Sequence, residues 1–510
     1  MKIFRWLVMG WLVSAGFSLV VAATWQGTVF NDANGSGRLD PGEAGVAGVG
    51  VSNGIQVVLT DAAGRYELTG EGDGFVFVIK PRGWRIPADA RNLPGFYRRV
   101  AGVPTPPAGA MDFPLLATAE SDTFRAVFFS DTQVGSDREV DYFNRTIADG
   151  LAGAKDIAFG VTLGDVVNDH PELYPALDAA IARIGVPWHP LLGNHDLDLG
   201  ALEDRGSAAT FEKTYGPSTS AFRQGRVLFV ALNNIRYQGG LRYLGGLTGN
   251  QFEFLANLLR VTPRDDLVVV MTHMPWFYND PANNELFRLP DRTKLFGLLQ
   301  DRPNVLLLSG HTHYQRHVFH GADDGWRGAQ PLHEYNVAAV SGGFWGGPPD
   351  ANGIPVATMW DGTPHGYAIL SFNGTAIPAM DYQAARHPAD YQMSLWGPEV
   401  VALKQSFVSY YANVFNAHAG WKIESRVDDR TFSPMRWVVD WDPTYARQYL
   451  AQDAGPAPAP SPRLPDPLVS YHLWRAYLPA DLSAGTHTIE TRATDPAGKV
   501  YTAKRTVVIK

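Results

Sequence analysis

Five apolar segments of this sequence each end in a short polar motif whose side chains are of the types that bind metal ions. In chain order the motifs are SDTQ (130–133), GDVVND (164–169), GNHD (193–196), THMPW (272–276) and GHTH (310–313). Each motif alone is weak, because an Asp after a strand is usually a turn residue or a helix N-cap. Five such endings in one region are hard to explain as independent accidents. We therefore predict a single site that contains Asp131, Gln133, Asp165, Asn194, His273, His311 and His313.

The residue types indicate which chemistry such a site would perform. Carboxylate, amide-oxygen and imidazole ligands suit Mn, Fe or Zn and disfavour Cu(I). The chain contains no cysteine, which excludes thiolate metal sites and a cysteine nucleophile. Two divalent ions that share one carboxylate would leave a surplus of positive charge after Asp131 and Asp165 are counted. This surplus can hold a phosphate and an activated hydroxide, which predicts phosphoester hydrolysis by a metal-bridging hydroxide.

The elements that must position these residues are predicted from hydrophobic periodicity. Between about 123 and 375, apolar runs such as RAVFFS and DLVVVMT alternate with helical candidates, of which 248–260 has Thr248 as its expected N-cap. Strands that alternate with helices predict a layered α/β domain, and sites form at the carboxyl ends of strands in such sheets. Glycine before Asp165, Asn194 and His311 allows the chain to turn sharply there.

Two regions whose sequences predict short β-strands flank this domain. Residues 24–118 contain short alternating stretches divided by Gly and Asp turns, and 385–510 returns to the same pattern. The expected organisation is a small β domain, a central α/β domain over 123–375 and a second β domain. The net charge of −8 supplies no basic surplus, so no nucleic-acid-binding surface is predicted.

The first 23 residues have the layout of a secretory signal peptide, with a basic start, an apolar core and small residues before Thr24. The alternative is an uncleaved membrane anchor, because the apolar stretch is nearly long enough to span a bilayer. No other segment approaches a membrane span. We expect cleavage after Ala23 and a periplasmic or secreted mature protein, whose oligomeric state the sequence leaves open.

The segment DANGSGRLDPGE (32–43) has the ligand spacing of an EF-hand calcium loop, with Gly37 at the sixth position. Its flanks are predicted as strands, so this would be an EF-hand-like loop in a β module, similar to the calcium-binding β repeats of bacterial surface proteins. The alternative is a turn-rich hairpin that binds nothing. The predicted ligands of a structural calcium ion are Asp32, Asn34, Ser36, the carbonyl of Arg38, Asp40 and Glu43.

The five motifs, in this order, resemble the signature motifs of the calcineurin-like metallophosphoesterase superfamily. The resemblance implies a central four-layer α/β sandwich of two sheets flanked by two small all-β domains, as in a three-domain exported subfamily. Residues 24–118 are similar to its N-terminal domain, and the tail from about 385 is similar to its C-terminal domain. A metal-dependent phosphatase or phosphodiesterase is implied, and the choice between monoester and diester stays open because both reactions use the same metal pair.

The resemblance also implies which residue binds which metal ion. Many members have His at the position of Gln133, whose amide oxygen is a harder ligand and would shift the preference toward Mn. The implied ligands are Asp131 and His313 for one metal, Asp165 for both, and Asn194, His273 and His311 for the other.

His195 would not be a ligand in this scheme. Its implied role is to stabilise the transition state or to protonate the leaving oxygen. Asp169 or Asp196 would orient its imidazole, as carboxylates behind such histidines commonly do. Many members have Asp at the position of Asn168, which leaves the orienting partner of His195 open.

Two loops are candidates for the substrate pocket, 341–350 and 360–367. Their residues Trp345, Tyr367 and His365 would either contact a base, sugar or phosphate or serve as structural packing. The expected substrate is a phosphorylated small molecule or a cell-envelope compound. A hypothesis from another class is a catalytically inactive, calcium-stabilised cell-surface binding protein, against which the complete ligand set argues.

Overall fold

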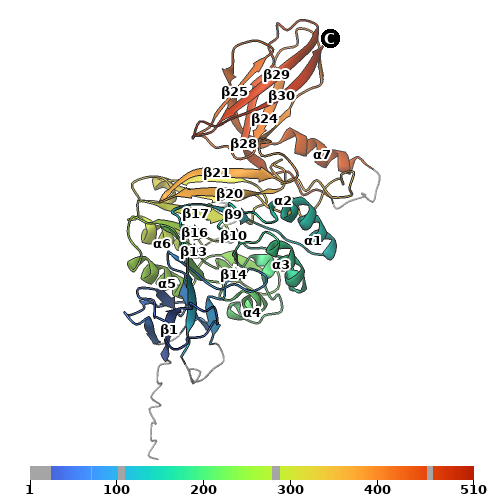
Figure 1. The fold of residues 1–510 in the computed structure, drawn as a ribbon. Helices are drawn as coiled ribbons and strands as arrows, with labels where there is room; N and C mark the ends of the chain where they lie inside the picture. The colour runs from blue at the N-terminus through green and yellow to red at the C-terminus, as the bar shows by residue number, and fades with distance from the viewer. Residues whose placement is uncertain (1–23, 70–71, 101–109, 278–287, 456–462) are drawn as a thin grey trace, which may run out of the picture.

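The residues that the computed structural model describes are 24–69, 72–100, 110–277, 288–455 and 463–510. The predicted signal peptide lies outside them. In these ranges, no helix has both the length and the apolar character needed to cross a membrane. Figure 1 shows a blue β domain at one end, a central part with stacked sheets and helices, and an orange-to-red β domain at the other end.

Two sheets lie face to face in the central part. The first consists, in spatial order, of β11 (Trp188–Pro190), β10 (Phe159–Thr162), β9 (Thr123–Phe129), β20 (Gly366–Asn373) and β21 (Ala376–Ala384). The second consists of β12 (Ser220–Gln224), β13 (Val227–Ala231), β16 (Leu267–Met271), β17 (Val305–Ser309), β19 (Leu332–Asn336) and β18 (Arg316–His320). Strands β9 to β11 are parallel, as are β13, β16, β17 and β19. The sheets meet in an apolar layer, where the ring centroids of Phe159 and Phe229 are 5.0 Å apart.

Helices cover the outer faces of the two sheets and complete four layers (Figure 1). The first group is α1 (Asp137–Phe143), a π-helical turn (Asn144–Ala148), α2 (Asp149–Leu151) and α3 (Tyr174–Ala182). The second group is α5 (Gly249–Arg260) and α6 (Leu289–Leu299), and the smaller elements are α4 (Ala209–Tyr215) and the hairpin of β14 (Ile235–Tyr237) and β15 (Tyr243–Gly245). Helix α5 begins as predicted, because the Thr248 side chain accepts a hydrogen bond from the backbone amide of Gln251. The predicted fold class is confirmed.

The N-terminal domain contains two four-stranded sheets around an apolar core. One consists of β4 (Arg65–Thr69), β1 (Thr24–Asn31), β8 (Phe113–Ala117) and β6 (Trp84–Arg85). The other consists of β3 (Val57–Leu59), β2 (Gly50–Ser52), β5 (Phe75–Ile79) and β7 (Tyr97–Arg99). The alternation of buried and exposed residues along β4 is the pattern expected of a strand with one face on the core.

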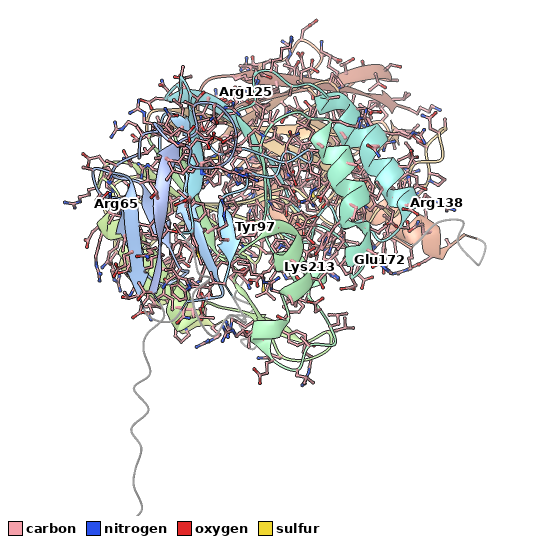
Figure 2. All side chains as sticks on the ribbon, turned by 60° about the horizontal axis from the view of Figure 1, so that its bottom comes forward. Arg65, Tyr97, Arg125, Arg138, Glu172 and Lys213 are labelled. Atoms are coloured by element: carbon pink, nitrogen blue, oxygen red, sulfur yellow. The ribbon has the colours of Figure 1, made fainter. Side chains whose placement is uncertain are left out.

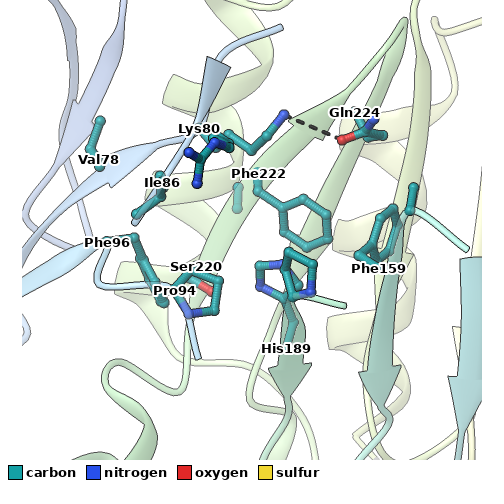
Figure 3. A pocket seen from close by; sticks show the side chains of 14 residues that line it. Val78, Lys80, Ile86, Pro94, Phe96, Phe159, His189, Ser220, Phe222 and Gln224 are labelled. Atoms are coloured by element: carbon teal, nitrogen blue, oxygen red, sulfur yellow. Dashed lines mark hydrogen bonds between the residues drawn. The ribbon is translucent and has the colours of Figure 1, made fainter. Parts of the chain in front are cut away.

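The N-terminal domain packs directly on the central part. Phe77 contacts Phe254 of α5, with ring centroids 5.8 Å apart, and Figure 2 shows Tyr97 near α4. Between the two domains lies a cavity of about 50 Å³, where His189 stacks on Phe222 at a centroid distance of 4.0 Å (Figure 3). Burial lowers the pKa of His189 to about 3, so the ring is neutral. A space of this size admits only a few water molecules.

The C-terminal domain is a second sandwich of two sheets. One consists of β22 (Met393–Trp396), β24 (Ser409–Val414), β28 (Val469–Tyr477) and β27 (Arg436–Trp441). The other consists of β23 (Val400–Val401), β30 (Val500–Ile509), β29 (Gly485–Thr494), β25 (Lys422–Val427) and β26 (Ser433–Pro434), and the helix is α7 (Pro443–Asp453). The domain joins the central part near β18, where the Gln315 side chain donates a hydrogen bond to the carbonyl of Phe415. Strand β21 falls between the predicted ranges 123–375 and 385–510 and belongs to the central sheet.

Candidate metal centre

The predicted site residues come together at the carboxyl ends of five strands. Asp131, Asp165 and Asn194 follow β9, β10 and β11 of the first sheet. His273 and His311 follow β16 and β17 of the second sheet. Both sheets present these ends at one edge, so residues far apart in the sequence meet, and the backbone amide of His311 donates to Asp131 Oδ2 at 2.9 Å. Four of these five side chains are buried, and His311 is half-buried.

The backbone at these residues is strained. Asp131, Asp165, His311 and His313 have φ values of 51°, 51°, 75° and 52°. Residues other than glycine reach this left-handed region at a cost of roughly 1 kcal/mol or more each. Such strain persists only where the surrounding contacts hold it, and it is concentrated at functional sites. The conformation lets each side chain leave the line of its strand at the sheet edge.

Two of the motif glycines are needed not only for the turn but also because a side chain at their positions would overlap a predicted ligand. A Cβ atom at Gly193 would overlap the carboxylate of Asp165, and one at Gly164 would overlap the imidazole of His273. The backbone can therefore approach the predicted ligands closely only because these positions lack a side chain. The sequence predicts the turn, and the structure adds the close approach.

Four potential ligand atoms face one another around His273. Its Nε2 lies 3.2 Å from Asp165 Oδ2, 3.1 Å from Asn194 Oδ1 and 3.3 Å from His311 Nδ1. Its Nδ1 lies 2.8 Å from the carbonyl oxygen of Leu163, which places a proton on Nδ1 and makes Nε2 the nitrogen that is directed at the cluster. Asp165, His273 and His311 each offer a donor atom within 4.8 Å of the others. This donor set fits a divalent cation with mixed nitrogen and oxygen ligands.

The protonation of the cluster indicates how strongly it attracts positive charge. Burial alone would lower the pKa of His273, but the charge and hydrogen bond of Asp165 outweigh burial and raise it to about 9. Burial would raise the pKa of Asp165, but the charges of His273 and His195 hold it well below its usual range. Burial, followed by repulsion from His273, lowers the pKa of His311 to about 3. His311 is therefore neutral near pH 7, as a metal ligand must be.

Asp131 and His313 form a second group of donors. His313 Nε2 lies 3.6 Å from Asp131 Oδ1, and its Nδ1 faces the carbonyl oxygen of Gly342, which leaves the Nε2 lone pair on the side of Asp131. Asp131 also accepts a hydrogen bond from the Ser130 hydroxyl, and burial raises its pKa. Trp360 stacks on the His313 ring at a centroid distance of 5.2 Å and so restrains its orientation.

Gln133 is placed differently from the oxygen ligand that the sequence predicts. Its Nε2 donates to Asp165 Oδ2 at 2.9 Å, and its Oε1 lies 3.4 Å from the Ser341 hydroxyl. In this orientation the amide nitrogen, not the oxygen, faces the predicted bridging carboxylate. Binding of a metal by the Gln133 oxygen would require the amide to turn and to give up its hydrogen bond to Asp165.

His195 lies beside the donor cluster. Its backbone amide donates to Asp165 Oδ1 at 2.9 Å, and its Nδ1 lies 3.1 Å from Asp169 Oδ1. Burial would lower the pKa of His195, but the charges of Asp165 and Asp169 outweigh burial and raise the pKa above its ordinary value. An imidazolium held by a carboxylate in this way is suited to donate a proton to a leaving group.

Asp196 does not contact the His195 ring, in contrast to one of the two expected arrangements. The donors to its carboxylate are the backbone amides of Gly193 (2.9 Å), Val166 (3.1 Å) and Val167 (3.2 Å) and the hydroxyl of Tyr174 (3.1 Å). These bonds tie the second motif to the third. Burial, followed by repulsion from Asp165, raises the pKa of Asp196 to about 7. The structure therefore assigns the contact with His195 to Asp169 and gives Asp196 a structural role.

The aromatic residues considered for the substrate pocket are buried. Trp345 Nε1 donates to the carbonyl of Thr132 at 3.0 Å, and His365 Nδ1 lies 2.9 Å from the carbonyl oxygen of Val340. Tyr367 is buried as well. These contacts favour the packing interpretation of the three side chains.

Two aromatic side chains that lie beside the metal centre are not predicted from the sequence. Phe344 is 38 % exposed, and its ring centroid lies 4.4 Å from that of His313. The edge of another ring, Tyr243, meets His311 at a centroid distance of 6.0 Å. Phe344 stands beside Trp345 in the glycine-rich loop 341–350, and the sequence of that loop does not distinguish which of the two rings is exposed.

The sequence of the chain matches models of one protein family along most of its length. Models of the calcineurin-like phosphoesterase family match three successive parts of the chain: its N-terminal domain over 33–117, the calcineurin-like phosphoesterase domain itself over 124–315, and its C-terminal domain over 334–501. Among solved structures, the chain is similar to a purple acid phosphatase from seeds of yellow lupin (Lupinus luteus). That likeness has a TM-score of 0.37 and 14% sequence identity and covers 72% of this chain and 68% of the other. No curated protein matches the chain.

Proposed function

This chain belongs to the calcineurin-like phosphoesterase family, and from that membership we propose that it hydrolyses a phosphate ester at a centre of two divalent metal ions. The observation that carries the proposal is the convergence of Asp165, Asn194, His273 and His311, since one donor atom of each of the other three lies within 3.3 Å of His273 Nε2. The raised pKa of His273 indicates that this cluster attracts positive charge, which a bound divalent cation would supply.

The proposed ligands of the two ions are Asp131, His313 and Gln133 for one, Asp165 for both, and Asn194, His273 and His311 for the other. Metal ions bound there would supply Lewis acidity toward the phosphoryl oxygens and a deprotonated water at neutral pH. The mixed donor set fits Mn, Fe or Zn.

His195 is proposed to donate a proton to the leaving oxygen. Its imidazole is oriented by Asp169 at 3.1 Å, and its raised pKa keeps a larger fraction protonated at neutral pH. Its backbone amide donates to Asp165 at 2.9 Å, which attaches the loop that carries the ring to the predicted bridging ligand.

A metal analysis combined with a two-substrate assay tests this function. The purified protein should contain bound metal, and with Mn²⁺ it should hydrolyse p-nitrophenyl phosphate, bis-p-nitrophenyl phosphate or both. The ratio of the two kcat/KM values decides between monoester and diester. Treatment with EDTA should abolish turnover, and Mn²⁺ should restore it. Absence of both bound metal and turnover would favour the inactive cell-surface binding protein instead.

We propose, further, that residues 1–23 are removed and that the mature protein is periplasmic or secreted. Strand β1 begins at Thr24, the first residue after the expected cleavage site, and pairs with β4 from that residue onward. The amino-terminal sequence of the exported protein, which should begin at Thr24, tests the cleavage.

The loop 32–43 is proposed to bind a structural calcium ion. Asp32 is 1% exposed, and its Oδ2 accepts the backbone amide of Gly37 at 3.0 Å, while its Oδ1 is buried and has no hydrogen-bond partner within the described residues. Glu43 repeats this pattern, because Oε2 accepts the backbone amide of Asp40 at 3.0 Å and Oε1 is buried without a partner in the same part of the chain. Buried carboxylate oxygens without a donor are costly, and a bound cation would remove that cost.

Calcium should raise the melting temperature of the chelator-treated protein. At a concentration 100 times the dissociation constant, binding to the folded state adds about 2.7 kcal/mol of stability. Asp32→Ala should abolish the shift. Asp61→Ala is the control, because Asp61 caps a different turn of the same domain through the amides of Ala63 and Arg65. It should lower the melting temperature but keep the calcium shift; a shift that survives Asp32→Ala would contradict the proposed site.

A further inference from the structure

Arg316 begins strand β18 at the sheet edge where the metal centre lies. It pairs with Asn336 of β19, and Asn336 pairs with Ser309, the last residue of β17 before Gly310 and His311. Neighbouring strands lie about 4.8 Å apart, so the Arg316 backbone is roughly 10 Å from Ser309. The arginine therefore starts from the same row of the sheet as the fifth motif.

The guanidinium of Arg316 lies over two aromatic rings. Its central carbon lies 3.6 Å from the ring centroid of Tyr471 and 4.7 Å from that of Phe277. Phe277 follows His273 by four residues, whereas Tyr471 comes from β28 of the C-terminal domain. Tyr314 lies nearby, with its ring centroid 6.5 Å from Phe277 and 6.4 Å from Tyr471. Segments of two domains thus contact one cation near the metal centre.

This cation has no anionic partner in the part of the chain that the structure describes. There, no carboxylate forms an ion pair with Arg316, and its N–H groups make no hydrogen bond. Arg426 shows the usual arrangement, because it stacks on Phe432 and also pairs with Glu490 at 2.7 Å. Contact with the rings uses none of the N–H groups of Arg316, and the N–H groups of a guanidinium match the two oxygens of a carboxylate or phosphate.

We propose that Arg316 binds a second oxyanion of the substrate, so that the preferred substrate is a phosphate ester whose alcohol portion carries a further phosphate or carboxylate. This inference rests on the proposed function, because it places the scissile phosphate at the metal centre. It also gives the C-terminal domain a part in substrate recognition, since Tyr471 supplies the closer of the two rings.

Three matched substrates test the inference with Mn²⁺-loaded enzyme: glycerol phosphate, 3-phosphoglycerate and 2,3-bisphosphoglycerate. The wild type should prefer at least one of the two substrates with a second oxyanion to glycerol phosphate by about tenfold or more in kcat/KM. Arg316→Gln should lower kcat/KM for the preferred substrate by about 10- to 100-fold and change that for glycerol phosphate less than twofold. For the preferred substrate, the kcat/KM of Arg316→Lys should lie between those of the wild type and Arg316→Gln. An ammonium keeps the positive charge but lacks the paired N–H groups of a guanidinium. The carboxylate and the bisphosphate arms distinguish the two kinds of oxyanion.

Arg426→Gln serves as the control, because Arg426 is also stacked on a ring but belongs to the C-terminal domain and is already paired. It should leave all three values unchanged. Tyr471→Phe should preserve the preference, whereas Tyr471→Ala should weaken it. An equal loss on all three substrates in Arg316→Gln, or no preference in the wild type, would overturn the inference. Failure of the proposed function has a different signature, because then p-nitrophenyl phosphate and its diester are not hydrolysed either; calorimetric binding of 2,3-bisphosphoglycerate to wild type and Arg316→Gln would still test the oxyanion site.

Discussion

Asparagine in place of Asp165 is expected to remove the metal ions from the centre and to lower turnover by at least about three orders of magnitude, equal to roughly 4 kcal/mol of transition-state stabilisation. Asp165 is the residue on which the donor groups converge: its Oδ2 lies 3.2 Å from His273 Nε2, and its Oδ1 accepts the backbone amide of His195 at 2.9 Å. Asparagine keeps the shape but loses the charge. Its amide hydrogens would also face groups that already act as donors, such as the Gln133 amide at 2.9 Å.

Metal content measured by elemental analysis and turnover of p-nitrophenyl phosphate check this expectation together. Asp178→Asn is a suitable control, because Asp178 is also a buried aspartate but is bound to Arg91 and Tyr215, away from the centre. This control should keep both its metal ions and its activity. Two metal ions retained in Asp165→Asn would exclude Asp165 as the bridging ligand.

Alanine in place of His195 is expected to lower kcat by about 10²- to 10⁴-fold while the metal content stays unchanged. The imidazole is lost, but the backbone amide that anchors the loop to Asp165 remains. Turnover of the wild type should fall as the pH rises through the pKa of His195, because the proton donor must be protonated, and this decline should disappear in the variant. The comparison of pH profiles separates a proton donor from a residue that only shapes the site.

Asp169→Asn provides the graded control for His195. Loss of the carboxylate at 3.1 Å should lower kcat by about 10- to 100-fold, less than loss of the imidazole itself. It should also shift the alkaline decline to lower pH, because Asp169 contributes to the raised pKa of His195. Metal loss in His195→Ala would instead assign this histidine to the ligand set.

Much of the candidate site could be predicted from the sequence because its signals are local. Asp131, Asp165 and His273 each stand directly after an apolar run, and the carboxyl ends of parallel strands meet at one edge whatever the loops between them do. The start of α5 was predictable for the same reason, since the Thr248 cap depends only on the next three residues. The end of the central domain was not, because β21 joins the first sheet through pairing with β20 rather than through any signal of its own.

The sequence by itself determined the strand-end motifs, the donor types and hence the family and the class of reaction. Only the tertiary structure decided that Asp169 is the carboxylate that contacts the His195 ring and that the amide nitrogen of Gln133 faces Asp165. It also decided that Phe344 rather than Trp345 is exposed. These choices depend on loop backbone angles and on contacts between distant segments. Arg316 is the clearest case, because one of its two aromatic partners, Phe277, directly follows the THMPW motif and the other, Tyr471, lies in another domain. Residue types and spacing place a donor at a strand end, but packing determines what it faces.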